Sequence, residues 1–367
     1  VHILTRRLST HTADYSQIEG VHEWRYEINS TNPITFLIST IKNVQKLYSR
    51  LTQQIVFDII NFHQPFSALA VNLIRGSSFL PKIYTCHSLS FEELQSRQPE
   101  KRLFYKPLFW LNIYLRKLIE NFSLKKSNHI IVLSQFTKDK LRTAYSIPEK
   151  KISLIPGAVN LENFYFAENK IALRQRRGLP EDKFILFTVR NLEPRMGLEN
   201  FIRAINLLRQ QTKDIHCVMG GEGPSRKKIE ALVQELNLQD SVTFTGFIPK
   251  EDLASYYQLA DFFVLPTVEL EGFGLVTVEA LACGLPVLGT PIGGTKEILG
   301  QFDQGFLFRD VMPESMAEKI LEKCRYYRER PQEYARLSQK CRRFVEENYS
   351  WEQNIKKTEE LFNELGA

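Results

Sequence analysis

Short apolar runs alternate with amphipathic segments along most of the chain. Residues 199–209 and 225–236 each carry apolar side chains at intervals of three and four, which is the spacing of a helix with one buried face. The apolar runs between such segments are four to six residues long, as in buried strands. Strand–helix alternation predicts parallel sheets covered by helices, so we expect an α/β protein. The runs lie at 55–60, 82–85, 129–133, 184–189, 216–219, 241–245, 262–266 and 286–289.

The number of strand–helix repeats exceeds what one doubly wound sheet usually holds, so we expect two such domains. The chain has 367 residues, enough for two domains of ordinary size. A polar, basic stretch at 168–178 separates two apolar runs and marks the boundary. We therefore expect an amino-terminal domain at 1–165 and a second domain at 166–347, with ligands bound at the carboxyl ends of their strands.

Composition narrows the class of protein. Hydrophobic residues make up 43% and charged residues 25% of the chain, which is typical of globular proteins and unlike disordered or fibrous ones. The five cysteines are dispersed with no Cys-x-x-Cys pair, which argues against a disulfide framework and against a zinc site. No apolar run reaches the roughly 18–20 residues that span a bilayer. We expect a cytoplasmic protein.

The net charge of +6 is concentrated in one segment. Residues 101–151 hold twelve Lys or Arg and three acidic residues, which gives +9 and leaves −3 for the rest of the chain. Three interpretations stay open: a helix with an apolar inner side and a basic outer side, a helix that lies on anionic lipid, and a nucleic-acid surface. Aromatic residues are interleaved with the bases: Phe104, Tyr105, Phe109, Trp110, Tyr114 and Phe122.

The segment from Glu271 to Glu279 is the most informative one. It follows the predicted strand 262–266 and opens a helix, with Gly272 and Gly274 near its start. Eight residues of ideal helix rise by roughly 12 Å, so Glu279 is expected well inside the helix and Glu271 at or before its amino end. Exposed N–H groups there favour an anion, and each carboxylate can accept hydrogen bonds from a diol. The alternative is a glycine loop in which Glu271 caps the helix and Glu279 is solvated.

Three more loops connect a predicted strand to a predicted helix in the second domain. Residues 220–224 and 291–295 are rich in glycine, and residues 189–197 carry Arg190 and Arg195. Guanidinium groups form bidentate hydrogen bonds with a diphosphate. Each loop alone is ordinary in a doubly wound domain, but together with the paired carboxylates they favour a phosphate-bearing ligand.

Residues 188–202, 220–224, 242–249 and 271–299 resemble the retaining glycosyltransferases of family four. The Glu-x7-Glu segment and the residues after it are the most specific part of the resemblance, which is looser in the first half, at 85–87, 132–134 and 155–157. It implies the GT-B architecture, in which two Rossmann-like, doubly wound domains face each other across a cleft. It also implies that a final helix at 348–367 crosses back to the first domain.

The resemblance assigns roles to the residues at matching positions. It implies that Glu279 binds the ribose of a nucleotide sugar, that Glu271 binds hydroxyls of the transferred sugar, and that His87 contacts that sugar from the first domain. Backbone groups at Ile248 would contact the base. The implied catalytic residues are His87, Arg195 and Glu271. The implied donor-binding residues are Arg190, Asn191, Gly221, Ile248, Gly272, Phe273, Gly274, Leu275 and Glu279.

Two features depart from the pattern of the family. Many members carry Arg and Lys at the positions of Asn191 and Met196, whereas this chain has Arg190 and Arg195 one place earlier. We expect Arg195 to bind the diphosphate, and the one-residue shift turns Arg190 to the other face of its strand end. The opening strand and glycine-rich loop of the family have no counterpart before Val1. Two alternatives stay open: they belong to a segment upstream of Val1, or the first domain lacks them.

The resemblance implies transfer of a hexosyl unit, with retention, from a nucleotide diphosphate sugar to a glycan or lipid-linked acceptor in polysaccharide or glycolipid biosynthesis. A UDP-glucose-like donor is expected first, from its frequency in the family. No Asp-x-Asp pair occurs, so we expect no metal ion and no other cofactor, and Arg195 with the loop amides would stabilise the leaving phosphate. We expect no nucleic-acid partner. A lipid-linked acceptor would make residues 101–151 a contact with an anionic membrane surface, with the enzyme peripheral on its inner face.

Two other functions fit the same donor site. A nucleotide-sugar epimerase of the GT-B fold would need the donor alone, and a non-catalytic nucleotide-sugar-binding protein would bind the donor without turnover. Release of free nucleotide with and without an acceptor distinguishes the three.

Overall fold

The computed structural model describes residues 1–8, 12–74, 79–97 and 106–366, which divide by their internal contacts into two compact units. Unit 1 comprises Val1–Val132, Thr137–Leu154 and Glu359–Ala367. Unit 2 comprises Leu133–Phe136 and Ile155–Thr358.

The boundary between the units differs from the expected division at 165/166. The chain enters unit 2 after Leu154, because Val159 and Phe164 are buried in the core of unit 2. The last helix, α15 (Trp351–Gly366), begins in unit 2, and its residues from Glu359 onward group with unit 1.

Unit 2 is built on a five-stranded parallel sheet with the order β10-β9-β8-β11-β12. β9 and β11 are buried along their whole length, as apolar runs with helices on both faces must be. The strand order reverses between β8 and β11, so the loops after these two strands leave the same edge of the sheet as neighbours. The strands are β8 (Phe184–Val189), β9 (Ile215–Gly220), β10 (Val242–Gly246), β11 (Phe262–Leu265) and β12 (Val287–Gly289).

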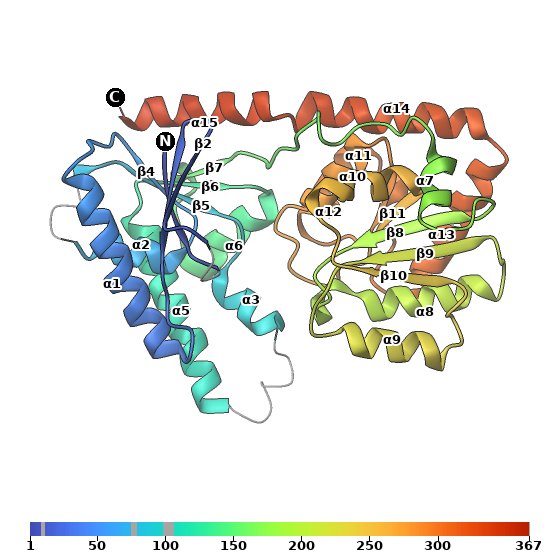
Figure 1. Cartoon of the computed structure of the whole chain (residues 1–367), viewed down its shortest axis with the longest axis horizontal. Helices are drawn as coiled ribbons and strands as arrows, with labels where there is room; N and C mark the ends of the chain where they lie inside the picture. The colour runs from blue at the N-terminus through green and yellow to red at the C-terminus, as the bar shows by residue number, and fades with distance from the viewer. Residues whose placement is uncertain (9–11, 75–78, 98–105, 367) are drawn as a thin grey trace. The chain divides into compact units, whose positions relative to one another are not determined.

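Helices cover both faces of this sheet, with α8 and α9 on one face and α10, α11 and α12 on the other (Figure 1). The two predicted helical stripes correspond to α8 and α9, whose apolar residues face the core. The helices are α7 (Lys170–Arg176), α8 (Leu198–Arg209), α9 (Arg226–Glu235), α10 (Lys250–Leu259), α11 (Leu275–Ala282), α12 (Gly293–Phe302), α13 (Pro313–Arg328) and α14 (Pro331–Asn348).

The described strands of unit 1 form two sheets. A parallel sheet has the order β4-β5-β6-β7, and a smaller sheet has the order β1-β3-β2, in which β2 and β3 are antiparallel. The predicted strand at 55–60 is displaced: β4 begins at Ile60, and Val56 is 94% exposed in the preceding loop. The strands are β1 (His2–Arg6), β2 (Tyr15–Ile18), β3 (Val21–Tyr26), β4 (Ile60–Phe62), β5 (Lys82–Cys86), β6 (His129–Val132) and β7 (Ile152–Leu154).

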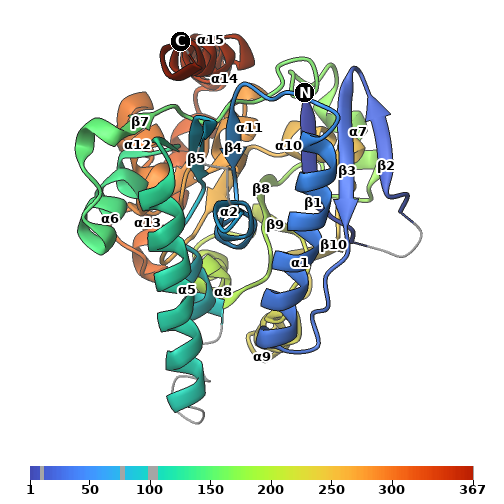
Figure 2. The same ribbon diagram turned by 90° about the vertical axis from the view of Figure 1, so that its left-hand side faces the viewer.

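Helices α1, α2 and α5 pack side by side in unit 1, with α2 between the other two (Figure 2). α1 starts at a capping box, since the Asn32 side chain accepts hydrogen bonds from the N–H groups of Ile34 and Thr35. The helices are α1 (Pro33–Thr52), α2 (Pro65–Asn72), α3 (Ser90–Arg97), α5 (Lys106–Lys126) and α6 (Gln135–Tyr145).

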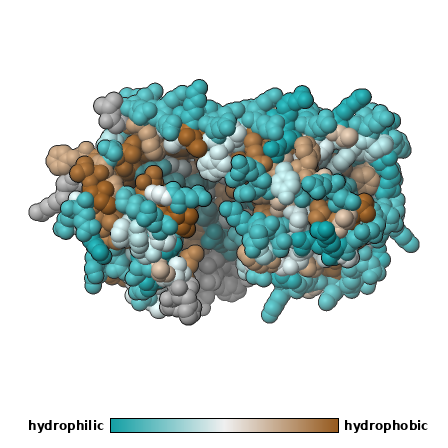
Figure 3. All heavy atoms as spheres, turned by 45° about the horizontal axis from the view of Figure 1, so that its top comes forward, coloured by the Kyte–Doolittle hydropathy of each residue, from teal (hydrophilic) through white to brown (hydrophobic). Residues whose placement is uncertain are grey.

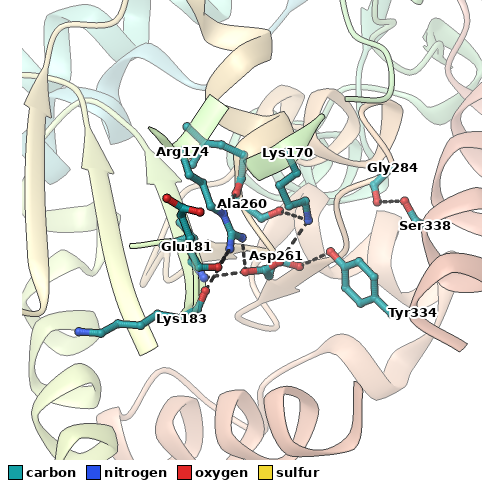
Figure 4. Close-up of polar contacts among 11 residues, drawn as sticks. Lys170, Arg174, Glu181, Lys183, Ala260, Asp261, Gly284, Tyr334 and Ser338 are labelled. Carbon is teal, nitrogen blue, oxygen red and sulfur yellow. Dashed lines mark hydrogen bonds and ion pairs between the residues drawn. The ribbon is translucent and has the colours of Figure 1, made fainter. Parts of the chain in front are cut away.

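A polar cluster around Asp261 ties α7 and α14 to the amino ends of β8 and β11 (Figure 4). The Asp261 carboxylate lies 2.6 Å from Nη2 of Arg174 and 3.1 Å from Nζ of Lys170, and it accepts a hydrogen bond from the N–H of Ile185. The Tyr334 hydroxyl donates to the Asp261 carbonyl at 2.7 Å. These contacts stabilise unit 2 at the amino ends of its strands, whereas the loops with the candidate site residues follow the carboxyl ends.

Candidate functional site

The loops that follow β8 and β11 bring the first predicted carboxylate together with a predicted arginine. Nη2 of Arg190 donates a hydrogen bond to Oε2 of Glu271 at 2.7 Å, and Thr267 Oγ1 donates to the same oxygen at 3.0 Å. Both side chains are nearly buried, with 7% of Arg190 and 11% of Glu271 exposed. Arg190 therefore balances the charge of Glu271 and orients its carboxylate.

The second predicted carboxylate lies inside a helix, as its spacing predicted. Glu279 belongs to α11 and is partly exposed, and its Oε2 accepts a hydrogen bond of 2.8 Å from the Tyr257 hydroxyl on α10. Burial raises the pKa of Glu279, while the Tyr257 hydrogen bond and the charge of Lys250 act in the opposite direction. Glu279 thus has one oxygen anchored in the core of unit 2.

The turn between the two carboxylates leads into the amino end of α11. Gly274 has a φ of 91° and is the residue before the helix, where no side chain caps the first N–H groups. A Cβ atom at Gly274 would lie 2.9 Å from Oγ1 of Thr295, so both the backbone conformation and the space require glycine. The uncapped helix start between two carboxylates is the arrangement expected of an anion site.

The glycine loop at the start of α12 packs against the backbone of this turn. The N–H of Gly294 donates to the Glu271 carbonyl at 2.8 Å, and a Cβ at Gly294 would lie 2.2 Å from the Phe273 carbonyl oxygen. Gly293 has a φ of 51° and also packs on the Glu271 backbone. Gly293 and Gly294 thus allow close backbone packing. The phosphate-bearing ligand that the glycine loops favour when taken together stays a prediction.

The loops after β8 and β9 also pack backbone against backbone. Gly221 has a φ of 111°, and a Cβ there would lie 1.8 Å from the Arg190 carbonyl oxygen. Asn191 is exposed, and Ile248 is buried against Gly220. Gly221 therefore has a role in backbone packing. From the sequence, a glycine in this loop could equally have been there to contact a ligand.

Arg195 lies in a short 3₁₀ turn, Pro194–Met196, between β8 and α8. Its Nη1 donates to the Leu270 carbonyl at 2.7 Å, and its Nε is 3.4 Å from the Glu193 carboxylate. Arg195 thereby braces the residue just before Glu271. The Glu193 carboxylate partly balances the charge of Arg195 in this position.

His87 lies in unit 1, directly after β5, and its neighbour is His63, which directly follows β4. His87 Nε2 and His63 Nδ1 are 3.0 Å apart, and the two exposed rings stack. Desolvation by the surrounding protein and the charge of His87 lower the pKa of His63 to about 4, and desolvation also lowers the pKa of His87. The role of His87 at a sugar stays a prediction.

Three residues that contact the predicted site residues carry no clear signal in the sequence: Thr267, Tyr257 and His63. His63 had only a weak signal, since it comes three residues after the predicted strand at 55–60, and the pairing of β4 with β5 that brings it to His87 is a property of the folded sheet. Thr267 lies four residues before Glu271, but nothing in the sequence distinguishes it from other loop threonines. Within the described ranges, no group of three or more His, Cys, Asp or Glu side chains could hold a metal ion.

Both halves of the chain match families of known proteins. Residues 169–338 match the family described as Glycosyl transferases group 1, and residues 1–163 match Glycosyltransferase Family 4. The GDP-mannose-dependent alpha-(1-6)-phosphatidylinositol monomannoside mannosyltransferase of Mycolicibacterium smegmatis is 29% identical over 175 residues, which are 46% of this chain and 45% of that protein.

Solved structures are similar over nearly the whole chain. Sucrose-phosphate synthase of Thermosynechococcus elongatus has a TM-score of 0.81 and 25% identity, with 99% of this chain and 88% of that chain covered. HepE of Anabaena in complex with UDP-glucose has a TM-score of 0.71 and 19% identity, with 92% and 85% covered. The two units thus share their fold with enzymes that bind or transfer sugars.

Proposed function

The chain belongs to the group 1 and family 4 glycosyltransferases and has their GT-B fold, and on that premise we propose that it transfers a hexosyl unit with retention from a nucleotide diphosphate sugar to a glycan or lipid-linked acceptor. The observation that carries this proposal is the pair Glu271 and Glu279, one on each side of the uncapped start of α11. A nucleotide sugar has hydroxyls at both ends and a diphosphate between them, which matches two carboxylates around a helix amino end.

In this proposal each element of unit 2 has a task. Glu279 accepts hydrogen bonds from the ribose hydroxyls, and Glu271, held by Arg190, accepts them from the sugar. The N–H groups of Gly272, Phe273, Gly274 and Leu275 face the diphosphate. Backbone groups at Ile248 contact the base, and Arg195 adds positive charge near the phosphates.

The chemical step breaks the bond between the anomeric carbon and the diphosphate oxygen. The acceptor hydroxyl oxygen attacks on the same face, and its proton passes to the leaving phosphate oxygen. Negative charge grows on the diphosphate, and the amino end of α11 together with Arg195 stabilises it. We propose that these groups act without a metal ion, so activity persists in the presence of a chelator.

UDP-glucose is the first donor that we propose. The support is that HepE, a structural neighbour, was solved with UDP-glucose. The mannosyltransferase relative of Mycolicibacterium smegmatis depends on GDP-mannose by its name, so a guanosine diphosphate sugar is the main competitor. A thermal-shift screen of uridine, guanosine and adenosine diphosphate sugars decides between them: the matching donor raises the midpoint most, and a chain stabilised by none contradicts the proposal.

The membrane contact that we propose rests on α5 of unit 1. Its outer side carries an exposed apolar stripe with helical spacing, and brown apolar surface also interrupts the polar surface of unit 1 in the left-hand half of Figure 3. The outer side is therefore apolar, not simply basic, which differs from one of the three interpretations of the sequence. The stripe consists of Leu108, Leu111, Leu115 and Leu118.

Positive charge lies at the carboxyl end of the same helix, where Lys125 and Lys126 are exposed. An apolar stripe with bases nearby favours the surface of an anionic membrane, where a lipid-linked acceptor would be found. Phe104, Tyr105 and the bases at 101 and 102 lie outside the described residues. None of the helices in the described part of the chain combines the length and apolar character needed to cross a bilayer.

Turnover separates the proposed activity from its two alternatives. With a lipid-linked acceptor, a transferase releases free nucleoside diphosphate and forms a glycosylated product. An epimerase converts the donor without acceptor, and a binding protein leaves it unchanged. Donor conversion that ignores the acceptor, or donor binding without any product, would contradict the proposal.

A further inference from the structure

We propose that Tyr257 is a positioning residue for Glu279: its phenol fixes one carboxylate oxygen and directs the other to the ribose hydroxyls of the donor. This inference rests on the proposed function, in which Glu279 binds the ribose. Tyr257 does not touch the nucleotide in this account, and it acts only through Glu279.

The Tyr257 ring is held firmly in the core of unit 2. Its side chain is 0% exposed, and it makes edge-on contacts with Phe164, Phe187 and Phe263, with ring centroids 5.4–5.9 Å apart. Close packing on three sides leaves the ring one orientation. The hydroxyl is thereby placed 2.8 Å from Oε2 of Glu279.

Glu279 is less confined than the Tyr257 ring, because it is partly exposed. A glutamate side chain on a helix surface has several rotamers, and ordering it when a ligand binds weakens the binding. The Tyr257 hydrogen bond removes most of this freedom in advance. The carboxylate is therefore preorganised for a diol before the donor arrives.

The phenol also favours the ionised carboxylate. Burial raises the pKa of Tyr257 well above its usual range, so the hydroxyl keeps its proton and donates it. The hydrogen bond holds the pKa of Glu279 down against burial. The other groups that act on this pair are Lys250 on α10, the Cys283 thiol directly after α11 and the Arg190 charge. An ionised carboxylate accepts from two hydroxyls, whereas a protonated one does so poorly.

The test compares Tyr257→Phe with a matched control, Tyr334→Phe. Each variant removes one phenol hydroxyl from unit 2, but the Tyr334 hydroxyl donates to the Asp261 carbonyl at the amino ends of the strands. Calorimetry measures the binding of uridine diphosphate and of its 2′,3′-dideoxy analogue, or of the guanosine pair if the screen selects guanosine. The dissociation constant of the dideoxy analogue divided by that of the ribonucleotide measures how much the ribose hydroxyls contribute to binding.

Tyr257→Phe should weaken the binding of the ribonucleotide by about 3- to 10-fold, the usual effect of one lost hydrogen bond, and leave the dideoxy analogue nearly unchanged. The acid limb of ribonucleotide binding should move to higher pH, because Glu279 protonates more easily without the phenol. Tyr334→Phe should change neither. If Tyr257→Phe weakens the binding of both nucleotides equally, the ratio stays at the wild-type value, and this result would overturn the inference.

Glu279→Gln separates this inference from the proposed function. If Glu279→Gln lowers the ratio while Tyr257→Phe does not, Glu279 binds the ribose and only the positioning role is wrong. If Glu279→Gln leaves the ratio unchanged, the ribose role fails, and the inference fails with it. Circular dichroism and the unfolding midpoint of each variant show whether it is folded at the assay temperature.

Discussion

At the scale of single residues, charge balance in the interior dominates the candidate site. Glu271 is buried and has Arg190 and Thr267 as hydrogen-bond donors. Removing one partner of a buried ion pair leaves a charge without compensation, which costs far more than breaking an exposed pair. Arg190 is therefore important for stability before any ligand is considered.

Replacing Arg190 tests this account. Arg190→Gln should lower the free energy of unfolding by about 3–5 kcal/mol in urea denaturation. Arg309→Gln is the control, because Arg309 is 71% exposed and its contact with Glu318 is 3.7 Å long, so the loss should stay below about 1 kcal/mol. The double variant Arg190→Gln/Glu271→Gln should recover part of the stability. Similar losses for Arg190 and Arg309 would show that the buried pair contributes little.

The two carboxylates should differ in their effect on kinetics. Glu279→Ala should weaken donor binding by about 10- to 100-fold, because the donor hydroxyls lose a charged hydrogen-bond acceptor. Glu271→Ala should chiefly slow transfer, by about 100-fold in kcat, with a smaller change in donor affinity. Glu269→Ala is the matched control, since Glu269 is exposed two residues before Glu271. Normal turnover in both site variants would refute the assignment.

At the scale of elements, the start of α11 and the outer side of α5 carry the predictions. α11 begins at a residue with a positive φ and no capping side chain. α5 is apolar on both sides, because Phe109, Ile113 and Leu124 are buried while its outer leucines are exposed. Exposed leucines in a row on a helix are typical of a surface that contacts a partner, and a membrane surface is the one that we propose.

Gly274→Ala should strain the turn before α11. The positive φ and the 2.9 Å approach to Thr295 together should cost about 1–3 kcal/mol in unfolding free energy and weaken nucleotide binding. Gly300→Ala in α12 is the control, because nothing lies within 4 Å of its added Cβ, and it should stabilise the chain by about 0.5–1 kcal/mol. A Gly274→Ala variant as stable as wild type would show that the turn relaxes.

Neutralising the bases of α5 should reduce membrane binding. The triple variant Lys117→Gln/Lys125→Gln/Lys126→Gln should bind anionic vesicles at least about tenfold more weakly, since each lysine near the surface contributes roughly 1 kcal/mol. The control Lys319→Gln/Lys323→Gln/Lys340→Gln removes the same charge from α13 and α14 of unit 2. Sedimentation with phosphatidylglycerol vesicles measures both. Equal loss in the two triples would mean that net charge, not this helix, determines binding.

At the scale of the whole molecule, the residues around Asp261 contribute to the stability of unit 2 at a place remote from the candidate site. It joins α7 and α14 to the sheet of unit 2, and it lies at the amino ends of the strands, whereas Glu271 follows a carboxyl end. A change in this cluster should therefore affect folding of unit 2 without changing the chemistry of the site.

Asp261→Asn tests that separation. It removes the charge that pairs with Arg174 and Lys170, so the unfolding free energy should fall by about 3–5 kcal/mol. The backbone amides of unit 2 should lose protection from hydrogen exchange. At temperatures below the unfolding transition, the dissociation constant for nucleotide should stay within about twofold of the wild-type value. Asp310→Asn is the control, because the Asp310 side chain is 43% exposed, and it should change neither. A large fall in nucleotide affinity at temperatures where Asp261→Asn is folded would contradict the separation.

The sequence by itself determined the α/β class, the parallel strands of unit 2 and the place of Glu279 inside a helix. These features depend on apolar spacing and on residue order within a few positions, which the sequence displays directly. The same reasoning misplaced the strand at 55–60, because a short apolar run does not show whether other elements will cover it.

Only the tertiary structure decided which side chains meet. Arg190 and Glu271 are 81 positions apart, and Tyr257 reaches Glu279 from a different helix. The order of β8 and β11 in the sheet brings the first pair together, and the packing of α10 beside α11 brings the second. The glycines at 221, 293 and 294 could be read as ligand contacts until the backbone beside them was known. Long-range strand order and close packing are properties of the folded chain, so local sequence patterns do not contain them.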